Sequence, residues 1–270
     1  MSTQQQDAAF PRYSLLGLPV NALSKQDLVD LAGVAIRGNK RYVIANHNMH
    51  GIYLTYDDPR MREFFAKADF VHLDGMALVW MGRLFGLPLS RKDRTTYIDF
   101  MPAIMERAAR EGWRISYLGS KPGIAEEGAQ ILRRQYPGLQ IQVQSGYFDS
   151  SRNSAENQAV LENIRNYQPH ILLVGMGMPR QEMWLLENLE GINVNAVYCC
   201  GAMMDYLTGN IPTPPRWMGQ IGFEWLYRLL SEPNRLWRRY LVEPWTVLGL
   251  VAKEFVNPAR RNPSTGGADR

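Results

Sequence analysis

The stretch HILLVGMGMPRQEMW, residues 170–184, decides the fold of this chain. It opens with an unbroken apolar segment, which indicates a strand that is buried on both faces of a sheet. Gly175, Gly177 and a proline follow at once and predict a sharp turn at which a ligand can approach the backbone. Gln181 and Glu182 then start a predicted helix. Open α/β sheets bind ligands where strands end and helices begin, so we expect polar recognition at this turn.

Strands and helices alternate on both sides of this stretch, from Trp113 onward. This alternation is typical of a Rossmann-like α/β fold, a parallel sheet with helices on both faces. Pro122 is expected in the first turn of one helix and Ser154 as the cap of another. The predicted strands are RISYLG (114–119), LQIQVQSGYF (139–148), HILLVGMG (170–177) and VNAVYCCGAMM (194–204), and the predicted helices are KPGIAEEGAQILRRQ (121–135), SAENQAVLENIRNYQ (154–168) and PRQEMWLLENL (179–189).

The first part of the chain shows a less regular α/β pattern, in which Asp74 and Gly75 join a strand to a helix. We expect one compact α/β core over residues 13–212, with both ends of the chain, residues 1–12 and 257–270, disordered. The predicted elements before the core's regular half are YSLLGLPV (13–20), a helix at SKQDLVDLAGVAIRG (24–38), a strand at RYVIANHN (41–48) and a strand and helix at DFVHLDGMALVW (69–80).

The character of the chain changes after NIPTPPRW (210–217), whose prolines mark a break. Three short helical stretches are predicted to follow, with Pro233 and Pro244 each at the start of one. In RLWRRYLV (235–242), helical geometry places aromatic and leucine side chains on one arc and three arginines on the other. Residues 213–256 therefore predict a helical appendage that associates with a polyanion, either membrane headgroups or nucleic acid. Its arginines are Arg216, Arg228, Arg235, Arg238 and Arg239.

The composition excludes several classes of protein. With 46% hydrophobic residues and a formal net charge of +4, the chain is typical of globular proteins and not of disordered ones. Cys199 and Cys200 are adjacent in a predicted strand, where neighbouring side chains point to opposite faces, so no disulfide between them is expected. The chain shows no signal peptide pattern and no run of about 18 apolar residues. We expect a protein of the reducing cytoplasm that binds a membrane from its surface.

Glycines follow four of the predicted strands, in GSKPG (119–123), SGYFD (145–149), GMG (175–177) and CCGAMMD (199–205). One such glycine alone indicates only a turn, but four at one edge of a sheet favour a nucleotide cleft. The dinucleotide fingerprint GxGxxG is absent, because a proline and an arginine follow the second glycine of GMGMPR. A nicotinamide-dependent oxidoreductase therefore stays an alternative, but the chain does not contain the dinucleotide-binding fingerprint of that class. The candidate nucleotide-binding residues are Gly119, Gly146, Tyr147, Gly175 and Gly177.

Asp74 is a second candidate at the sheet edge. It follows the apolar strand FVHL, so its carboxylate is expected beside Asn46, His47 and Asn48 at the exit of RYVIANHN. A carboxylate between amides suits general base catalysis on a sugar hydroxyl, and the alternative is a helix cap. His47 and His50 have no further ligands at metal spacing, and the Asp-x-Asp motif that holds a metal in many sugar transferases is absent. Arginines are expected to neutralise phosphates instead.

Taken together, these motifs resemble the WecG/TagA/CpsF family of bacterial glycosyltransferases, glycosyltransferase family 26. The resemblance implies an inverting transferase, without metal or cofactor, at the cytoplasmic face of the inner membrane. It implies transfer of a sugar from a UDP donor to a sugar linked to a polyprenyl diphosphate. The matching motifs are ANHN (45–48), FVHLDGMALV (70–79), DRTTYIDF (93–100), YLGSKPGIAEE (117–127), GYFD (146–149), VGMGMPRQEMW (174–184) and PPRWMGQIGFEWLYRLLSEPNRLWRRYL (214–241), of which the last two are highly specific together.

The resemblance also implies roles for single residues. Asp74 matches the proposed catalytic base, and the C-terminal arginines match the side that meets the lipid diphosphate or the membrane. Two positions depart from the family pattern: the usual Thr-Pro-Asn is Asn-His-Asn at 46–48, beside the base, and the usual Arg-Ala-Pro is Thr-Pro-Pro at 213–215, without its arginine. The residues that match substrate-binding positions are Asn46, Asn48, Arg94, Asp99, Gln181 and Asp205.

The donor sugar is the least constrained prediction. The NHN and LDGMALVW motifs look like the GumM-like, xanthan-type branch, which implies β-1,4 transfer from UDP-glucose to glucosyl-diphospho-polyprenol in exopolysaccharide biosynthesis. The alternative is N-acetylmannosamine or its uronic acid, transferred to N-acetylglucosaminyl-diphospho-polyprenol in teichoic acid or enterobacterial common antigen pathways. A uronic acid calls for a cation near Asp74, for which only Arg94 is a candidate. A nucleic-acid-binding module and a non-catalytic scaffold are further alternatives. For the glycosyltransferase itself no nucleic acid partner is expected, and its oligomeric state stays open.

Overall fold

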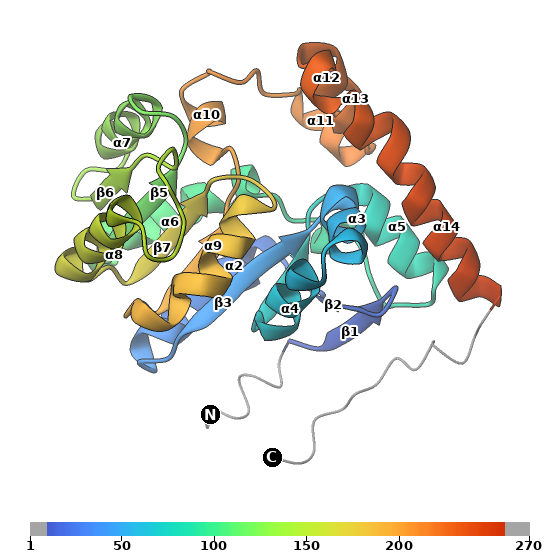
Figure 1. Ribbon diagram of the computed structural model, residues 1–270, viewed down its shortest axis with the longest axis horizontal. Helices are drawn as coiled ribbons and strands as arrows, with labels where there is room; N and C mark the ends of the chain where they lie inside the picture. The colour runs from blue at the N-terminus through green and yellow to red at the C-terminus, as the bar shows by residue number, and fades with distance from the viewer. Residues whose placement is uncertain (1–9, 257–270) are drawn as a thin grey trace. The chain divides into compact units, whose positions relative to one another are not determined.

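The computed structural model of the chain describes residues 10–256, without the side chains of Arg216 and Gln220 (Figure 1). Most of the two segments predicted to be disordered, residues 1–12 and 257–270, lies outside the described residues, and Arg12 already begins the first strand.

A six-stranded parallel sheet in the order β4-β3-β8-β7-β5-β6 carries the fold, and helices flank it (Figure 1). The predicted Rossmann-like α/β class is thereby confirmed. The apolar run ILLVG is buried along its whole length, as expected of a strand that is covered on both faces. The strands of this sheet are β3 (Tyr42–His47), β4 (Phe70–Leu73), β5 (Arg114–Gly119), β6 (Gln140–Gln144), β7 (Ile171–Gly175) and β8 (Ala196–Cys199), and β1 (Arg12–Leu15) and β2 (Leu18–Asn21) form a separate antiparallel hairpin.

The internal contacts divide the chain into two compact units. Among the described residues, the first unit comprises 10–25, 45–96 and 214–256, and the second unit comprises 26–44 and 97–213. The helices are α2 (Lys25–Arg37), α3 (Met49–Asp57), α4 (Pro59–Lys67), α5 (Met76–Leu84), α6 (Tyr97–Glu111), α7 (Ile124–Gln135), α8 (Ala155–Tyr167), α9 (Arg180–Asn188), α10 (Met203–Leu207), α11 (Arg216–Gln220), α12 (Glu224–Ser231), α13 (Pro233–Trp237) and α14 (Glu243–Val256), with a π-helical turn at Arg238–Val242 and 3-10 turns at Arg91–Asp93 and Leu189–Gly191.

In the second unit the structure confirms the predicted start of α8 but not that of α7. It also adds α6, which the sequence does not predict, and places Met203 and Met204 in α10, where the sequence predicts a strand. Ser154 caps α8, because its hydroxyl oxygen accepts a hydrogen bond from the backbone N–H of Asn157 at 3.0 Å. The prediction for Pro122 is wrong: it precedes α7, because Gly123, at φ 87°, turns the chain before the helix begins. The carboxylate of Glu126 accepts a hydrogen bond from the backbone N–H of Gly123 at 2.8 Å and so completes the helix start.

The C-terminal helices of the first unit differ from the three separate stretches that the sequence predicts. Pro233 begins α13 as expected, but Pro244 does not start a separate helix, since it lies in the first turn of α14, directly after the π-helical turn. The wider π turn loosens the backbone bonding just ahead of the residue that has no N–H to donate. Residues 233–256 therefore form one continuous helical run. Val247 of α14 is fully buried in an apolar core that it shares with Leu18 of the hairpin.

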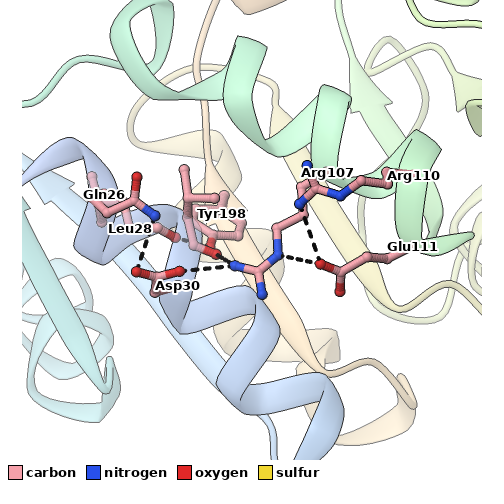
Figure 2. A network of polar contacts seen from close by, with 8 residues as sticks. Gln26, Leu28, Asp30, Arg107, Arg110, Glu111 and Tyr198 are labelled. Carbon is pink, nitrogen blue, oxygen red and sulfur yellow. Dashed lines mark hydrogen bonds and ion pairs between the residues drawn. The ribbon is translucent and has the colours of Figure 1, made fainter.

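Arg107 of α6 lies at the centre of a polar network in the second unit (Figure 2). Its Nη1 donates a hydrogen bond to Oδ1 of Asp30 on α2 at 2.9 Å, and its Nε donates one to Oε1 of Glu111 at 2.8 Å. Beside it, the hydroxyl of Tyr198 on β8 donates to the backbone carbonyl of Leu28 at 2.6 Å (Figure 2). The network thus ties α2 to α6 and to the sheet.

Replacing this arginine by a side chain of similar length but no charge tests the network. We expect Arg107→Met to lower the free energy of unfolding by about 2 kcal/mol, because it removes charged hydrogen bonds from a side chain that is 14% exposed. Arg110→Met is the matched control: Arg110 is 67% exposed and makes a 3.6 Å ion pair with Glu111, so a change within about 0.5 kcal/mol is expected. Urea denaturation followed by tryptophan fluorescence measures both, and equal effects would contradict the prediction.

Candidate active site

A cavity of about 330 Å³ lies within the first unit, beside the end of β4. Its volume is near the lower end of the range in which proteins bind small molecules, about 300–1,000 Å³. The wall combines charges of both signs with aromatic rings. Its charged, histidine and aromatic lining residues are His50, Asp74, Glu224, Trp225, Arg228, Arg239 and Tyr240.

Asp74 occupies the position that the sequence predicts, directly after β4. Its backbone N–H donates to the carbonyl of His47 at 2.7 Å, and its Oδ2 accepts a hydrogen bond from Nδ2 of Asn46 at 3.4 Å. The chain turns at Gly75, at φ 113°, and this glycine is the N-cap of α5, without any side-chain cap. The carboxylate of Asp74 therefore lines the cavity and does not cap the helix. Asn48 caps a different helix, α3, where its Oδ1 accepts a hydrogen bond from the backbone N–H of Gly51 at 2.9 Å.

The surroundings of Asp74 make it a stronger base than an ordinary aspartate. Burial, followed by the negative charge of Glu224, raises the pKa of Asp74 to about 6. Three arginines oppose this rise, in the order Arg228, Arg94 and Arg239, because their positive charges favour the ionised carboxylate. At neutral pH the carboxylate is ionised and ready to accept a proton.

Arg94 reaches this cluster through an ion pair that the sequence does not predict. Its Nη2 donates to Oε1 of Glu224 at 2.6 Å, although the two residues are 130 positions apart. Gly219 lies against the pair, since a Cβ atom there would come within 2.5 Å of Nη2 of Arg94. The pair thus joins the segment between the 3-10 turn at Arg91–Asp93 and α6 to α12, inside the first unit.

His50 forms a second pair with the C-terminal helices. Its Nδ1 lies 2.6 Å from Oε2 of Glu243, and both side chains are largely buried, with exposures of 16% and 14%. Burial, followed by the charge of Arg239, lowers the pKa of His50, while Glu243 raises it. His47, by contrast, turns inward: its ring packs on Phe65 with centroids 3.8 Å apart, and burial lowers its pKa to about 3. His47 is therefore no part of the cavity.

The C-terminal arginines separate into two groups. Arg228 and Arg239 line the cavity, so the prediction that Arg239 shares an outer arc with its neighbours is wrong. Arg235 is 55% exposed and pairs with Glu232, and the exposed Arg238 lies over the ring of Trp237 at 5.9 Å. The π-helical turn at Arg238–Val242 explains the difference, because it changes the angular spacing on which an α-helical arc depends. The side chain of Arg216 lies outside the described residues.

The glycines at the strand ends of the second unit let neighbouring strands meet closely. Gly119 pairs with Gly175 between β5 and β7, and a Cβ atom at Gly119 would lie 2.7 Å from the Cα atom of Gly175. A Cβ atom at Gly146 would lie 2.9 Å from the Cα atom of Gly119. These three glycines therefore serve packing. Gly177, at φ 78°, differs, because a Cβ atom there would meet nothing within 4 Å, and the side chain of Tyr147 is 61% exposed.

Polar side chains connect these strand ends. The hydroxyl of Ser120 donates to Oδ2 of Asp205 at 2.7 Å and lies 2.8 Å from the hydroxyl of Tyr117. Gln181 is 1% exposed, and its side chain is bonded to two loop amides, so it lies beneath the sheet edge. Asp99 lies in the first turn of α6, half-buried. The structure thus brings Asn46, Arg94 and Asp74 together in the first unit, and Asp205 and the glycines in the second.

A comparison with protein families matches residues 13–261 to the Glycosyl transferase WecG/TagA/CpsF family. The chain belongs to this family. The match covers the residues that line the cavity around Asp74 as well as the strand ends of the second unit.

In this glycosyltransferase, the sequence predicts Asp74 and Arg94, and the structure adds the acidic residues that lie near them or pair with their neighbours. Asp74 was found from its place after an apolar strand, and Arg94 from a motif. Glu224 and Glu243 were missed, because nothing in their local sequence marks them as partners of residues so far away in the chain. Within residues 10–256, no helix is long and apolar enough to cross a membrane.

Proposed function

We propose that this glycosyltransferase moves a hexose, with inversion at the anomeric carbon, from a UDP-sugar to a sugar carried on a polyprenyl diphosphate. Membership of the WecG/TagA/CpsF family supports the transferase class. The single observation that carries the mechanism is the cavity of the first unit, which combines one raised-pKa carboxylate, Asp74, with a cluster of arginines.

The chemistry of inversion needs a base and a charge that stabilises the leaving group. The acceptor hydroxyl attacks the anomeric carbon, its proton passes to the base, and the bond from that carbon to the UDP oxygen breaks with its electron pair on the diphosphate. Asp74, with a pKa of about 6, is matched to the first task near neutral pH. Arg94, Arg228 and Arg239 bring positive charge to the phosphates, so we propose that no metal and no cofactor is required.

The remaining predicted residues are assigned to recognition. Asn46 and Asn48 are assigned to sugar hydroxyls, since Asn46 bonds to Asp74 and Asn48 lines the cavity. The nucleotide is assigned to the strand ends of the second unit, where Gly177 leaves the backbone open and Asp205 fixes Ser120. Tyr147 and Asp99 belong to this assignment by their places at a strand end and at the α6 start. The packed glycines and the buried Gln181 belong to it as residues that hold the strand ends in position; these are Gly119, Gly146, Gly175 and Gln181.

The surface of the C-terminal helices supports binding to a membrane, at the cytoplasmic face of the inner membrane. Trp217 is 58% exposed and Trp245 is 73% exposed, and aromatic rings prefer the interface between water and lipid. Arg235 and Arg238 are exposed on the same C-terminal segment, and each basic side chain near an anionic surface contributes about 1 kcal/mol. Exposed aromatic side chains also favour self-association, so a homo-oligomer stays part of the proposal.

The preference for UDP-glucose rests on the NHN and LDGMALVW motifs. The charges around Asp74 are compatible with a uronic acid donor, because Arg94, Arg228 and Arg239 all act on Asp74. N-acetylmannosamine and its uronic acid therefore stay the alternative donors, with N-acetylglucosaminyl-diphospho-polyprenol as their acceptor.

A panel of radiolabelled donors tests the proposal. UDP-glucose, UDP-N-acetylmannosamine and its uronic acid are each offered with glucosyl and with N-acetylglucosaminyl diphospho-polyprenol, with and without EDTA. We expect glucose to be transferred to the glucosyl lipid at the same rate in EDTA, because arginines and not a metal neutralise the phosphates. Transfer of a mannosamine donor would overturn the glucose assignment alone, and loss in EDTA would overturn metal independence. No transfer, with reduction of a nicotinamide or salt-sensitive binding of DNA, would favour the other classes.

A further inference from the structure

Gln181, near the start of α9, joins two strand-end loops of the second unit. Its Oε1 accepts a hydrogen bond from the backbone N–H of Gly177, after β7, at 3.2 Å and another from that of Gly201, after β8, at 3.3 Å. The side chain is 1% exposed, so water does not replace these bonds. If the amide turned over, its NH₂ group would face two donors and both bonds would be lost.

Glu182 fixes the orientation of this amide. Nε2 of Gln181 donates to Oε1 of Glu182 at 2.7 Å, which places the amide nitrogen on the side of the carboxyl group and the amide oxygen on the side of the loops. Glu182 is itself 1% exposed, and its Oε2 is buried with no hydrogen-bond partner among the described residues. A buried carboxyl oxygen without a hydrogen-bond partner is costly, which indicates that Glu182 serves a purpose other than stability.

We propose that Glu182 is a positioning residue of the nucleotide site, which holds the loops after β7 and β8 in place through the amide of Gln181. The assignment of these loops to a nucleotide rests on the proposed function. The hydrogen bonds that link Glu182, Gln181 and the two loops, which we call the clamp, are present in the ligand-free protein. Gly177, whose loop backbone is open, is one of the two amides that the clamp holds.

The clamp is expected to respond to pH. Burial raises the pKa of Glu182 to about 7, while the hydrogen bond from Gln181 lowers it. Above this pKa the bond from Gln181 is charge-assisted and strong, and below it the neutral carboxyl group is a weaker acceptor. The group that faces Glu182 from β8 is the thiol of Cys199, whose own pKa is raised by burial and by Glu182 and which therefore stays neutral. On the same helix, Arg180 donates to the carbonyl of Phe148.

Nuclear magnetic resonance of the ligand-free protein tests the clamp directly. We expect the amide shifts of Gly177 and Gly201 to titrate together, with a common midpoint near the pKa of Glu182, about 7. In Glu182→Gln the acceptor oxygen remains but the charge cannot change, so both shifts should become independent of pH in this range. Glu190→Gln, at an exposed position of the turn after α9, is the matched control and should leave the titration as in the wild type. Shifts that do not titrate, or that titrate unchanged in Glu182→Gln, would overturn the inference.

Calorimetry with UDP-glucose tests the consequence for the nucleotide. This probe is suitable because its diphosphate is esterified at both ends and keeps its charge near neutral pH. We expect at least about fivefold tighter binding one pH unit above the midpoint than one unit below it, and equal affinities in Glu182→Gln. Titrating glycines with equal affinities in the wild type would overturn the positioning role. Titrating glycines with no binding of UDP-glucose at either pH would instead overturn the proposed nucleotide site and leave the clamp standing.

Discussion

Asp74→Asn is expected to lower the rate of sugar transfer by about 10²- to 10⁴-fold, the range that a positioned general base contributes. Asparagine keeps the shape of the side chain and its place after β4, but its amide cannot take the proton of the attacking hydroxyl. The rate is measured from the initial transfer of radiolabelled sugar to the lipid acceptor, at saturating donor. Because the change is confined to the base, binding of UDP-glucose by calorimetry should be unchanged.

Asp57→Asn is the matched control, because Asp57 is the exposed last residue of α3 in the same unit. We expect it to transfer sugar at the wild-type rate. If Asp74→Asn also transferred at that rate, Asp74 would be a structural part of the sheet edge and the base would have to be sought elsewhere in the cavity.

The pH profile of transfer reports on the same carboxylate. The pKa of Asp74 is raised to about 6, so the active, ionised form is present above this value and is lost as the pH falls through it. The acid limb of kcat/KM should therefore have its midpoint near this pKa. Glu224→Gln should move the limb to lower pH, because it removes a negative charge that raises the pKa of Asp74. A limb that stays in place would contradict the identification of Asp74 as the titrating base.

The sheet could be predicted from the sequence because its strands are written in local patterns. Each unbroken apolar run, such as ILLVG, predicts a strand without information from the rest of the chain, and Asp74 is predicted at the sheet edge because it directly follows such a run. The partners of Asp74 are different. Glu224 reaches Arg94 across 130 positions and Glu243 reaches His50 across 193, and no periodicity connects residues so far apart.

Local patterns also failed where the backbone departs from ideal geometry. The predicted arc of arginines assumes α-helical geometry over residues 235–242. Residues Arg238–Val242 form a π-helical turn instead, and Arg239 therefore faces the cavity. Likewise, the turn at Gly123 displaces Pro122 from the helix that its sequence predicts. In both places the departure lies in the backbone, in the positive φ of Gly123 and in the π-helical turn, and the spacing of apolar residues does not encode it.

Gly119→Ala is the second change with a large expected effect, on stability. The added Cβ atom would lie 2.7 Å from the Cα atom of Gly175, and this neighbour is backbone of the paired strand β7, which cannot rotate away as a side chain does. We expect the free energy of unfolding to fall by about 3 kcal/mol, the upper part of the usual range for overpacking. Urea denaturation measures the loss.

Gly191→Ala is the control for this substitution, because a Cβ atom at Gly191 meets nothing within 4 Å and this glycine is exposed. There we expect no loss, or a gain of about 0.5 kcal/mol from the stiffer unfolded chain. The substitution has a second consequence. Ser120 follows Gly119 and its hydroxyl donates to Asp205, so a shift of β5 away from β7 also moves this hydrogen-bonded pair. Gly119→Ala should thus weaken the binding of UDP-glucose even where the protein is still folded. Wild-type stability in this variant would show that the two strands have room to part, and would remove the packing argument for the glycine.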